Sequence, residues 1–590
     1  MRQTFPIAVG RMSQTAVLPR GMRMELLVVV VLGLLGIAAA TAFGPRLGVS
    51  APLLLVIVGI GTSLLPFVPE IEIDPEWILA GVLPPLLYSA SVSMPAMEFR
   101  REFSAIGGLS VGLVIVSSIA LGLLFAWLIP GLGVAGGIAL GAIVSPTDAV
   151  ATSIVKRVGV TPRIVTVLEG ESLLNDATAL VLLRSAIVAT AASVSLWDVL
   201  GDFVFAVVVA VVIGFLVGKL NLAVRERVTD PTVNTVISFT VPFLASVPSE
   251  ALGASGLVAA VVAGLVTGRG AIKRLSPQHR ASDTQAWRTV ELILEGTVFL
   301  VMGLEMSTIV AEVQGGRSGI ASGLLLAGVS LAAVLAVRAA FVFPTLGLQR
   351  RRARRGVQMR DRLAGMQDRL DHVDAEHPFT LERAGGPQKG ASRAVPKDRL
   401  AMFRRRVNRK VADIDYFTAE PLGWREGAVI VWAGMRGAVT LAAAQTLPAD
   451  TPERSLLVFV AFAVAAASLL IQGGTLPMIV RWVKPARLDV AAIEADRDEL
   501  DRMLREIART RIEEAKAASD GKPGEAARGY AFRLGVIDAQ RRALWAQRDE
   551  GRFSSTALTQ ALEALDATQI SLELHKRLDV QTEGEPNASS

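Results

Sequence analysis

Residues 169–183 read EGESLLNDATALVLL, a run that is apolar enough to lie in lipid and yet carries Glu169, Glu171 and Asp176. The run belongs to a longer apolar stretch, 164–190, with Asp176 close to its middle. A carboxylate at the centre of a bilayer costs about 2.5–3.5 kcal/mol on insertion scales, so a buried acid of this kind indicates a functional site. We therefore interpret Asp176 as the residue around which the protein works.

The composition places the whole chain in a membrane. Of its 590 residues 52% are hydrophobic and 19% charged, and the mean hydropathy is +0.48. Those values are typical of a polytopic membrane protein. The chain has no cysteine, which excludes disulfides and thiol chemistry, and its four histidines lie in polar segments. The net charge of +6 is explained by basic cytoplasmic loops, so no nucleic-acid partner is expected.

Apolar runs near the length that crosses a bilayer, about 17–25 residues, recur along the chain. We predict an all-α protein with about thirteen transmembrane helices, twelve or fourteen being the alternatives because three runs are short. The runs are 24–42, 50–66, 77–94, 104–129, 132–155, 164–190, 199–218, 231–247, 252–268, 288–308, 318–347, 424–446 and 455–482.

The loops set the orientation, because Lys and Arg collect on the cytoplasmic side. Every second loop is basic, and one of the alternate loops, PEIEIDPE at 69–76, is acidic. This alternation predicts a cytoplasmic C-terminus and an external N-terminus. Four arginines before the first span disagree, so either the chain starts at Met22 or Met24, or the later helices dominate.

The polar segments divide the chain into five parts. Residues 349–423 contain RRRARR and FRRRVNRK and are expected to form a basic cytoplasmic loop that touches anionic lipid or a regulatory partner. Residues 485–580 are expected to form two or three amphipathic helices. The predicted parts are an N-terminal segment (1–23), helices one to eleven (24–348), the basic loop (349–423), helices twelve and thirteen (424–484) and a cytoplasmic helical tail (485–590).

The helix that carries Asp176 presents several oxygen ligands together. Ser172 and Asp176 are four residues apart and share a face, and Glu171 and Asn175 share the adjoining face. Hard monovalent cations such as sodium are held by oxygen rather than by imidazole or sulfur. The spacing therefore predicts a sodium-binding site centred on Asp176.

The fifth span offers a partner for this site. GAIVSPTDAVATSIV, residues 141–155, places Thr147 and Asp148 beside Pro146, which breaks or kinks a helix. Transporters use broken helices for ion sites, because the freed backbone groups can line a cavity. A second break is predicted in the twelfth span, WAGMRGAVTLAAA at 432–444, where Gly434 and Gly437 bracket Arg436.

The remaining buried charges need compensation. Arg338 lies inside the eleventh span, and we expect Glu171 to pair with it, because an unpaired buried charge is costly. Asp148 has two open interpretations, since it could neutralise positive half-helix ends or bind the ion. Glu291 and Glu295 lie near the start of the tenth span and are expected to be interfacial, with no role beyond gating or packing.

Five ordered motifs, SPTDAVAT, LEGESLLNDATALVL, ASGLVAAVVAGLVTG, GMRGAVTLAAA and LLIQGGTLPMIVRW, resemble the bacterial NhaP-type sodium/proton antiporters of the electroneutral branch of the cation/proton antiporters. The resemblance spans about residues 24–484. It implies a homodimer in which each subunit has a dimerisation domain and a six-helix core domain with crossed broken helices.

The resemblance also assigns individual residues. Asp176 matches the family's essential ion-binding aspartate, with Thr147, Asp148 and Ser172 as neighbours. Asn175 matches the asparagine that replaces a second aspartate in electrogenic relatives, and the expected Glu171–Arg338 contact matches a structural ion pair. One departure is Ser89 in LPPLLYSA, where family members commonly carry an acid that supports the asparagine.

With one titrating carboxylate, the site is neutral when it holds either one proton or one sodium ion, so the expected activity is electroneutral one-for-one exchange by alternating access. We expect a secondary antiporter in the bacterial plasma membrane that moves Na⁺, with Li⁺ as a further substrate, against H⁺ and serves pH homeostasis. The alternatives are a K⁺/H⁺ antiporter of the same fold and a cation channel. No cofactor is expected and no enzymatic activity, because the chain lacks an HExxH motif and a Gly-rich phosphate loop.

Overall fold

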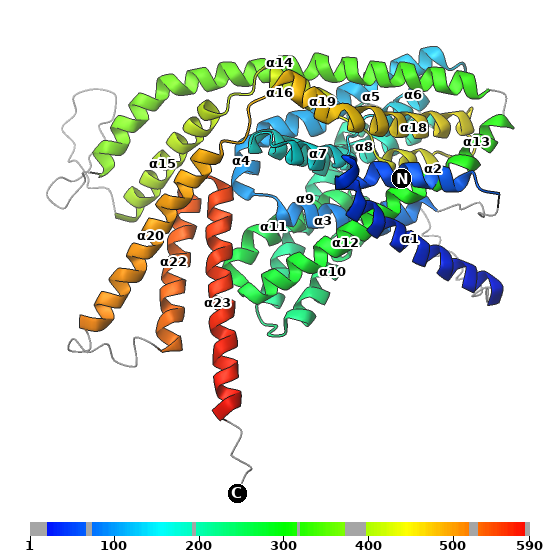
Figure 1. The fold of residues 1–590 in the computed structure, drawn as a ribbon. Helices are drawn as coiled ribbons and strands as arrows, with labels where there is room; N and C mark the ends of the chain where they lie inside the picture. The colour runs from blue at the N-terminus through cyan, green and yellow to red at the C-terminus, as the bar shows by residue number, and fades with distance from the viewer. Residues whose placement is uncertain are drawn as a thin grey trace, which may run out of the picture.

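The computed structural model describes residues 20–66, 74–191, 196–315, 319–371, 397–517 and 529–583, and these residues are almost entirely helical. The only β contact among them is an isolated bridge between Val160 and Arg487. The prediction of an all-α fold is confirmed (Figure 1).

The first half of the chain forms one membrane bundle. Its helices, with two short π-helical stretches, are α1 (Arg20–Leu47), α2 (Ala51–Ser63), η1 (Trp77–Val82), α3 (Leu83–Ser93), α4 (Ala96–Gly107), η2 (Gly108–Leu113), α5 (Val114–Leu128), α6 (Gly133–Val144), α7 (Val150–Val158), α8 (Pro162–Ala191), α9 (Leu196–Arg225), α10 (Pro231–Ala251), α11 (Gly256–Arg274), α12 (Pro277–Leu304) and α13 (Met306–Gln314). The second half of the chain adds α14 (Ile320–Asp371), α15 (Lys397–Ala419), α16 (Trp424–Trp432), α17 (Ala438–Gln445), α18 (Arg454–Ser468), η3 (Leu469–Gly473) and α19 (Gly474–Val483).

Each of the thirteen predicted runs contains a helix. Within the described residues, eight helical stretches are long and apolar enough to cross a bilayer, and three shorter apolar helices accompany them. The short second run is α2, with 13 residues. The tenth run begins earlier than predicted, because α12 starts at Pro277, well before the apolar residues, where Ser276 accepts a hydrogen bond from the His279 backbone and caps the helix.

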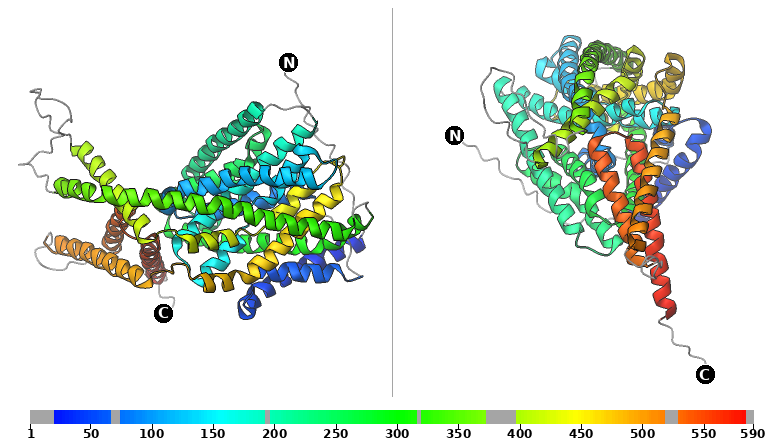
Figure 2. Two further views of the ribbon diagram at one scale, coloured as in Figure 1. Left: turned by 90° about the horizontal axis from the view of Figure 1, so that it is seen from above. Right: turned by 90° about the vertical axis from the view of Figure 1, so that its left-hand side faces the viewer.

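The predicted basic loop is partly wrong. Residues 349–371 continue α14 without a break, and 397–419 form α15, so both ends of the segment are helical. MRDRLAGMQDRL, residues 359–370, has a short apolar period at helical spacing. The remaining residues are rich in Arg and Lys, which are good helix formers, and period and propensity together explain the difference. Residues 372–396 lie outside the described part. α14 has 52 residues, about 78 Å at 1.5 Å per residue, and Figure 2 shows it running along the bundle and past its end.

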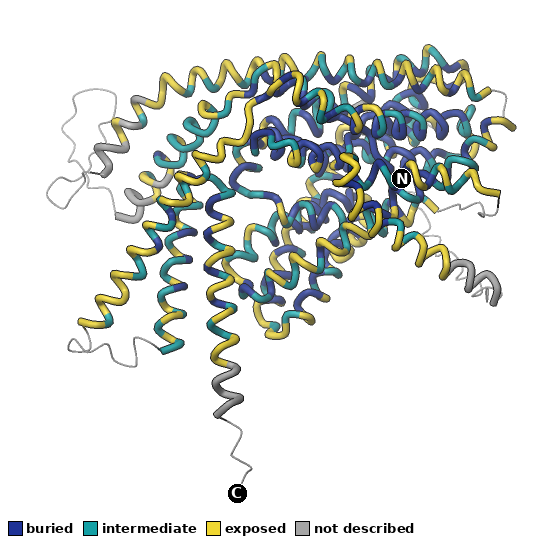
Figure 3. Tube along the Cα trace, viewed as in Figure 1, coloured by how far each residue is buried: buried dark blue, intermediate teal, exposed yellow. Residues whose placement is uncertain are grey.

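Two hydrophobic cores hold the bundle together. The larger core joins α5, α6, α8, α14 and α16 to α19, and the smaller one joins α3, α9, α10, α11 and α12. Small residues allow close contact within them, as where Gly59 of α2 faces the backbone of Gly303 in α12. Figure 3 shows the buried residues gathered around α5, α6, α8 and α18.

The tail contains three described helices, α20 (Val490–Ala517), α22 (Tyr530–Glu550) and α23 (Ser555–Glu583), as predicted. They share a small core of their own that includes Leu500, Ile537 and Phe553. The turn between α22 and α23 is made by Gly551 at φ 76°, a left-handed conformation that glycine adopts without strain. The polar segment SDGKPGE, residues 519–525, where we expect a break between two tail helices, lies outside the described residues.

Candidate functional site

Two broken helices meet at the centre of the bundle. The first is interrupted between α6 and α7, around Pro146, and the second between α16 and α17, around Gly434 and Gly437. The two interruptions are joined directly, because the Asp148 backbone N–H donates to the Met435 carbonyl at 2.8 Å. Four half-helix ends therefore lie together inside the protein, and the predicted pair of crossed discontinuous helices is confirmed.

Asp148 lies at the two positive half-helix ends. Its Oδ1 accepts a hydrogen bond from the Val150 N–H at 2.8 Å, at the first turn of α7. Its Oδ2 lies beside Gly437, the residue that precedes α17, so closely that a Cβ on residue 437 would overlap it. Helix N-termini carry unpaired N–H groups and partial positive charge, which a carboxylate offsets. The geometry therefore supports the interpretation that Asp148 neutralises positive half-helix ends. It leaves open whether Asp148 also binds the ion.

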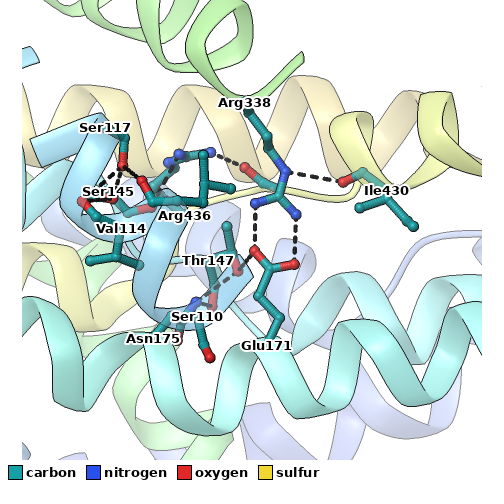
Figure 4. Close-up of polar contacts among 12 residues, drawn as sticks. Ser110, Val114, Ser117, Ser145, Thr147, Glu171, Asn175, Arg338, Ile430 and Arg436 are labelled. Atoms are coloured by element: carbon teal, nitrogen blue, oxygen red, sulfur yellow. Dashed lines mark hydrogen bonds and ion pairs between the residues drawn. The ribbon is translucent and has the colours of Figure 1, made fainter. Parts of the chain in front are cut away.

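Arg436 lies at the two negative half-helix ends. Its side chain is 2% exposed, and it donates to the Val144 carbonyl at 2.9 Å, to the Ser145 carbonyl at 3.3 Å and to the Gly434 carbonyl (Figure 4). These carbonyls end α6 and α16 and have no partner within their own helices. The opposite charges of Arg436 and Asp148 are thus matched to the opposite ends of the broken helices.

Glu171 and Arg338 form a buried, bidentate ion pair. The two guanidinium nitrogens lie 2.5 and 2.8 Å from the two carboxylate oxygens, and both side chains are 2% exposed. Arg338 Nε also donates to the Ile430 carbonyl at 3.1 Å, near the end of α16 (Figure 4). The pair therefore ties α8 to α14 and to the broken helix, and it leaves no net charge at this point.

Asn175 is held by the first broken helix. Its amide nitrogen donates to the Thr147 carbonyl at 2.9 Å and to Thr147 Oγ1 at 2.7 Å, and Thr147 in turn donates to Glu171 at 3.1 Å. This chain of contacts supports the asparagine without any acid at position 89. The Asn175 Oδ1 atom is buried and has no hydrogen-bond partner in the described part of the chain.

Asp176 differs from the other buried acids of the site. Its side chain is 8% exposed, and no hydrogen bond or ion pair to it is found among the described residues, although it interacts electrostatically with Asp148. Ser172, one turn earlier, is 8% exposed and donates to the Glu169 carbonyl at 3.0 Å. Among the acids of α8 and the helix breaks, which are Asp148, Glu169, Glu171 and Asp176, Asp176 is therefore the one whose charge is left without compensation by the described residues.

Two acids of α12, Glu291 and Glu295, interact with residues near the helix breaks. Glu295 is partly buried and interacts electrostatically with Asp148 and with Glu291. Ser89 of α3 is 5% exposed and is close enough to Glu291 to interact with its carboxylate. The sequence does contain a signal that Glu295 lies within the bundle, because this residue is well inside its apolar run, seven residues after the predicted start.

The charges around the two helix breaks are partly balanced. Within the described residues no group of three or more His, Asp or Glu side chains is placed to hold a metal ion. Glu171 is balanced by Arg338, Asp148 and Arg436 carry opposite charges at the half-helix ends, and Asp176 is unbalanced. These features define a secondary transporter built around two crossed, discontinuous helices.

Comparison with known proteins identifies the family. The family model described as sodium/hydrogen exchanger, transmembrane, matches residues 28–366 and 406–482, more than half of the chain. The protein therefore belongs to the transmembrane sodium/hydrogen exchangers, which are transporters, and its predicted NhaP-type resemblance is confirmed.

Two relatives and one solved structure illustrate this similarity. An uncharacterized Na⁺/H⁺ exchanger of Mycobacterium tuberculosis is 27% identical over 585 residues, which cover 92% of this chain and 96% of that protein. A sodium, potassium, lithium and rubidium/H⁺ antiporter of Bacillus subtilis is 31% identical over 275 residues, 45% of this chain and 41% of the relative. The solved structure of the sodium proton antiporter MjNhaP1 from Methanocaldococcus jannaschii matches with a TM-score of 0.55 at 15% identity, over 78% of this chain and 99% of that one, and shows the shared fold.

Proposed function

We propose that Asp176 is the carboxylate that binds either the transported cation or the proton. The observation that carries this proposal is its isolation: Asp176 is buried and has no hydrogen bond or ion pair with the described residues, whereas Glu171 is bound to Arg338. The candidate further ligands are oxygen atoms of Ser172 and Asn175 on the same helix and of Thr147 and Asp148 at the break between α6 and α7. The unpartnered Oδ1 of Asn175 is a carbonyl-type oxygen of the kind that sodium accepts.

The charge balance of the site supports electroneutral exchange. A site with one unbalanced negative charge becomes neutral with one proton or with one monovalent cation, and both loaded states then cross the membrane with the same charge. The proposed stoichiometry is therefore one Na⁺ for one H⁺. Either ion gradient can drive the cycle through alternating access. The ion site at the broken helices then becomes accessible from one side of the membrane and afterwards from the other.

The charge pattern and the family of the protein support a proposal for its membrane and its orientation. We propose a multi-pass protein of the bacterial plasma membrane with a cytoplasmic C-terminus, in which 24–348 and 424–484 are the transport unit and 349–423 and 485–590 lie in the cytoplasm. The resemblance to NhaP-type antiporters supports a homodimer and a role in pH homeostasis.

Sodium is the proposed substrate, with lithium as a second one and potassium as the alternative. The Bacillus subtilis relative is named for all three of these ions and rubidium, so the test includes each of them. Everted vesicles that contain the protein are acidified by respiration, and each chloride salt is added at equal concentration while internal pH is followed. Sodium-dependent alkalinisation that saturates and is lost in Asp176→Asn supports the proposal.

Two other results of the vesicle experiment would contradict sodium/proton exchange. A response to potassium alone would identify a K⁺/H⁺ antiporter. Cation flux that does not saturate and moves no protons would identify a channel.

A further inference from the structure

A basic cavity lies outside the ion site, at the end of the bundle where Lys and Arg collect. It has a volume of about 460 Å³, is open to the surface on one side and lies between the start of α4 and the middle of α15. The lining residues are Arg100, Met402, Arg406, Arg409, Lys410 and Asp413. Four cationic side chains thus surround one space that contains a single carboxylate.

The lining of the cavity is one face of α15. Residues 402, 406, 409, 410 and 413 recur at the three- and four-residue spacing that places side chains on the same side of a helix. Because α15 contributes this whole stripe and α4 contributes Arg100, the cavity is a product of the packing of these two helices.

The carboxylate in the cavity is already engaged. Asp413 accepts from Arg100 at 3.0 Å and from Arg101 at 2.7 Å, and the Arg101 side chain is only 4% exposed. Arg409 is also engaged, since its guanidinium donates to the Asp549 carbonyl near the end of α22 at 2.9 and 3.1 Å. The internal contacts of the protein therefore hold Arg100 and Arg409 in place around the cavity.

Two cations remain available. Arg406 and Lys410 are exposed, lie four residues apart, and have no hydrogen bond or ion pair with any of the described residues. Guanidinium and ammonium groups gathered without a carboxylate partner suit a phosphate group, which accepts several charge-assisted hydrogen bonds at once. Met402 at the end of the same stripe is 64% exposed and offers an apolar contact beside the cations.

We propose that this cavity binds the phosphate group of an anionic molecule, held by Arg406 and Lys410 and flanked by Arg100 and Arg409. A phospholipid headgroup and a soluble phosphate share this chemistry. The basic position and the exposed Met402 fit a headgroup whose chain lies against the methionine.

An occupant would also touch the junction between the membrane bundle and the tail. Arg409 contacts Asp549 of α22, and Arg101, which shares Asp413 with Arg100, donates to the Gly551 carbonyl at 2.9 Å. The cavity is therefore placed where a bound anion stabilises the docking of the tail on α4.

The test measures binding through thermal stability. Full-length protein, purified in detergent and stripped of lipid, is titrated with dioleoyl phosphatidylglycerol, with dioleoyl phosphatidylcholine and with the Tris salt of pyrophosphate, and the melting temperature is recorded. The variant Arg406→Gln/Lys410→Gln removes the two unpaired cations. The matched control, Arg351→Gln/Arg355→Gln, removes two exposed arginines from α14 at the same spacing, where neither has a partner among the described residues.

We expect phosphatidylglycerol to raise the melting temperature of the wild type. The half-saturating concentration should rise about tenfold or more in the cavity variant and less than about twofold in the control, since each basic group near an anionic surface adds appreciably to binding. An equal response to pyrophosphate identifies a soluble phosphate as the ligand, and a response to phosphatidylglycerol alone identifies a lipid. The proposal is overturned if both double variants lose affinity equally, or if neither anion changes the melting temperature of the wild type. If the double variant does not fold, the single variant Lys410→Gln takes its place.

Discussion

Asp148 of the first broken helix and Gly437 of the second approach so closely that no side chain fits between them: a Cβ on residue 437 would overlap Asp148 Oδ2. The same aspartate holds the first turn of α7 through the Val150 N–H at 2.8 Å. A group added at position 437 must therefore displace Asp148 from one half-helix end or separate the two breaks.

The first prediction is that Gly437→Ala lowers the melting temperature and reduces sodium-driven proton flux at least about tenfold, because the displaced carboxylate no longer offsets the α7 and α17 N-termini. Flux in everted vesicles and the melting temperature of purified protein measure the two effects. The control is Gly328→Ala in α14, where an added Cβ meets nothing within 4 Å and alanine favours the helix. Wild-type flux in both variants would show that the close approach is unimportant.

The second prediction concerns Asp176. Asp176→Asn keeps the volume of the side chain and removes the group that exchanges a proton for a cation, so exchange should be abolished while the protein still folds. Flux in everted vesicles and the melting temperature are the measurements. The control is Asp202→Asn at an exposed position of α9, which should transport normally. Full exchange by a folded Asp176→Asn variant would exclude Asp176 as the transporting carboxylate.

The third prediction concerns stability. Glu171→Gln or Arg338→Ala leaves one buried charge without its partner, and removing half of a buried pair costs about 3–5 kcal/mol. We expect low yield and a much lower melting temperature for both variants. Arg509→Ala breaks an exposed pair with Glu513, whose side chains are 69% and 61% exposed, and such pairs contribute at most about 1 kcal/mol. Equal melting temperatures for all three variants would contradict a structural role for the Glu171–Arg338 pair.

The fourth prediction follows from Glu295. Its carboxylate is close enough to Asp148 for the two to interact electrostatically, and its negative charge should favour a cation that approaches the site. Glu295→Gln is expected to raise the sodium concentration for half-maximal flux several-fold, while the maximal rate changes less. Glu312→Gln, at an exposed position of α13, is the control. An unchanged sodium dependence in Glu295→Gln would mean that α12 acts only through packing.

The sequence predicted the elements of the fold better than the contacts between them. Apolar length located the spans, and Pro146 located one break, because both effects are local. Arg436 was recognised only as a residue within a break, since its contact with Val144 joins positions 292 apart in the chain. Such a contact depends on which helices cross, and hydrophobic periodicity does not report that.

Two further differences have separate causes. Residues 349–371 extend α14 because helix propensity, the short apolar period of residues 359–370 and continuity with the preceding span are sufficient there. Glu295 was placed near the membrane surface because apolar runs define depth to within a few residues only. The support of Asn175 by Thr147 could not be predicted either, because it depends on the local path of the broken helix.

The last prediction is that Asn175→Asp impairs transport and does not convert the protein into an electrogenic antiporter. The Asn175 amide donates to the Thr147 carbonyl at 2.9 Å and to Thr147 Oγ1 at 2.7 Å, and an aspartate has no N–H group with which to replace the bond to the carbonyl. Its charge would also lack a partner, because Arg338 already binds Glu171 through two nitrogens.

Purified wild-type protein in liposomes should exchange sodium for protons at a rate that does not depend on a membrane voltage clamped with valinomycin and potassium. Asn175→Asp should be slower at every voltage, and Asp202→Asn should match the wild type. Because one unbalanced carboxylate gives neutral loaded states with either ion, voltage-dependent transport by the wild type would mean that Asp148 or Glu295 also changes its charge during the cycle. The single-carboxylate mechanism would then be wrong.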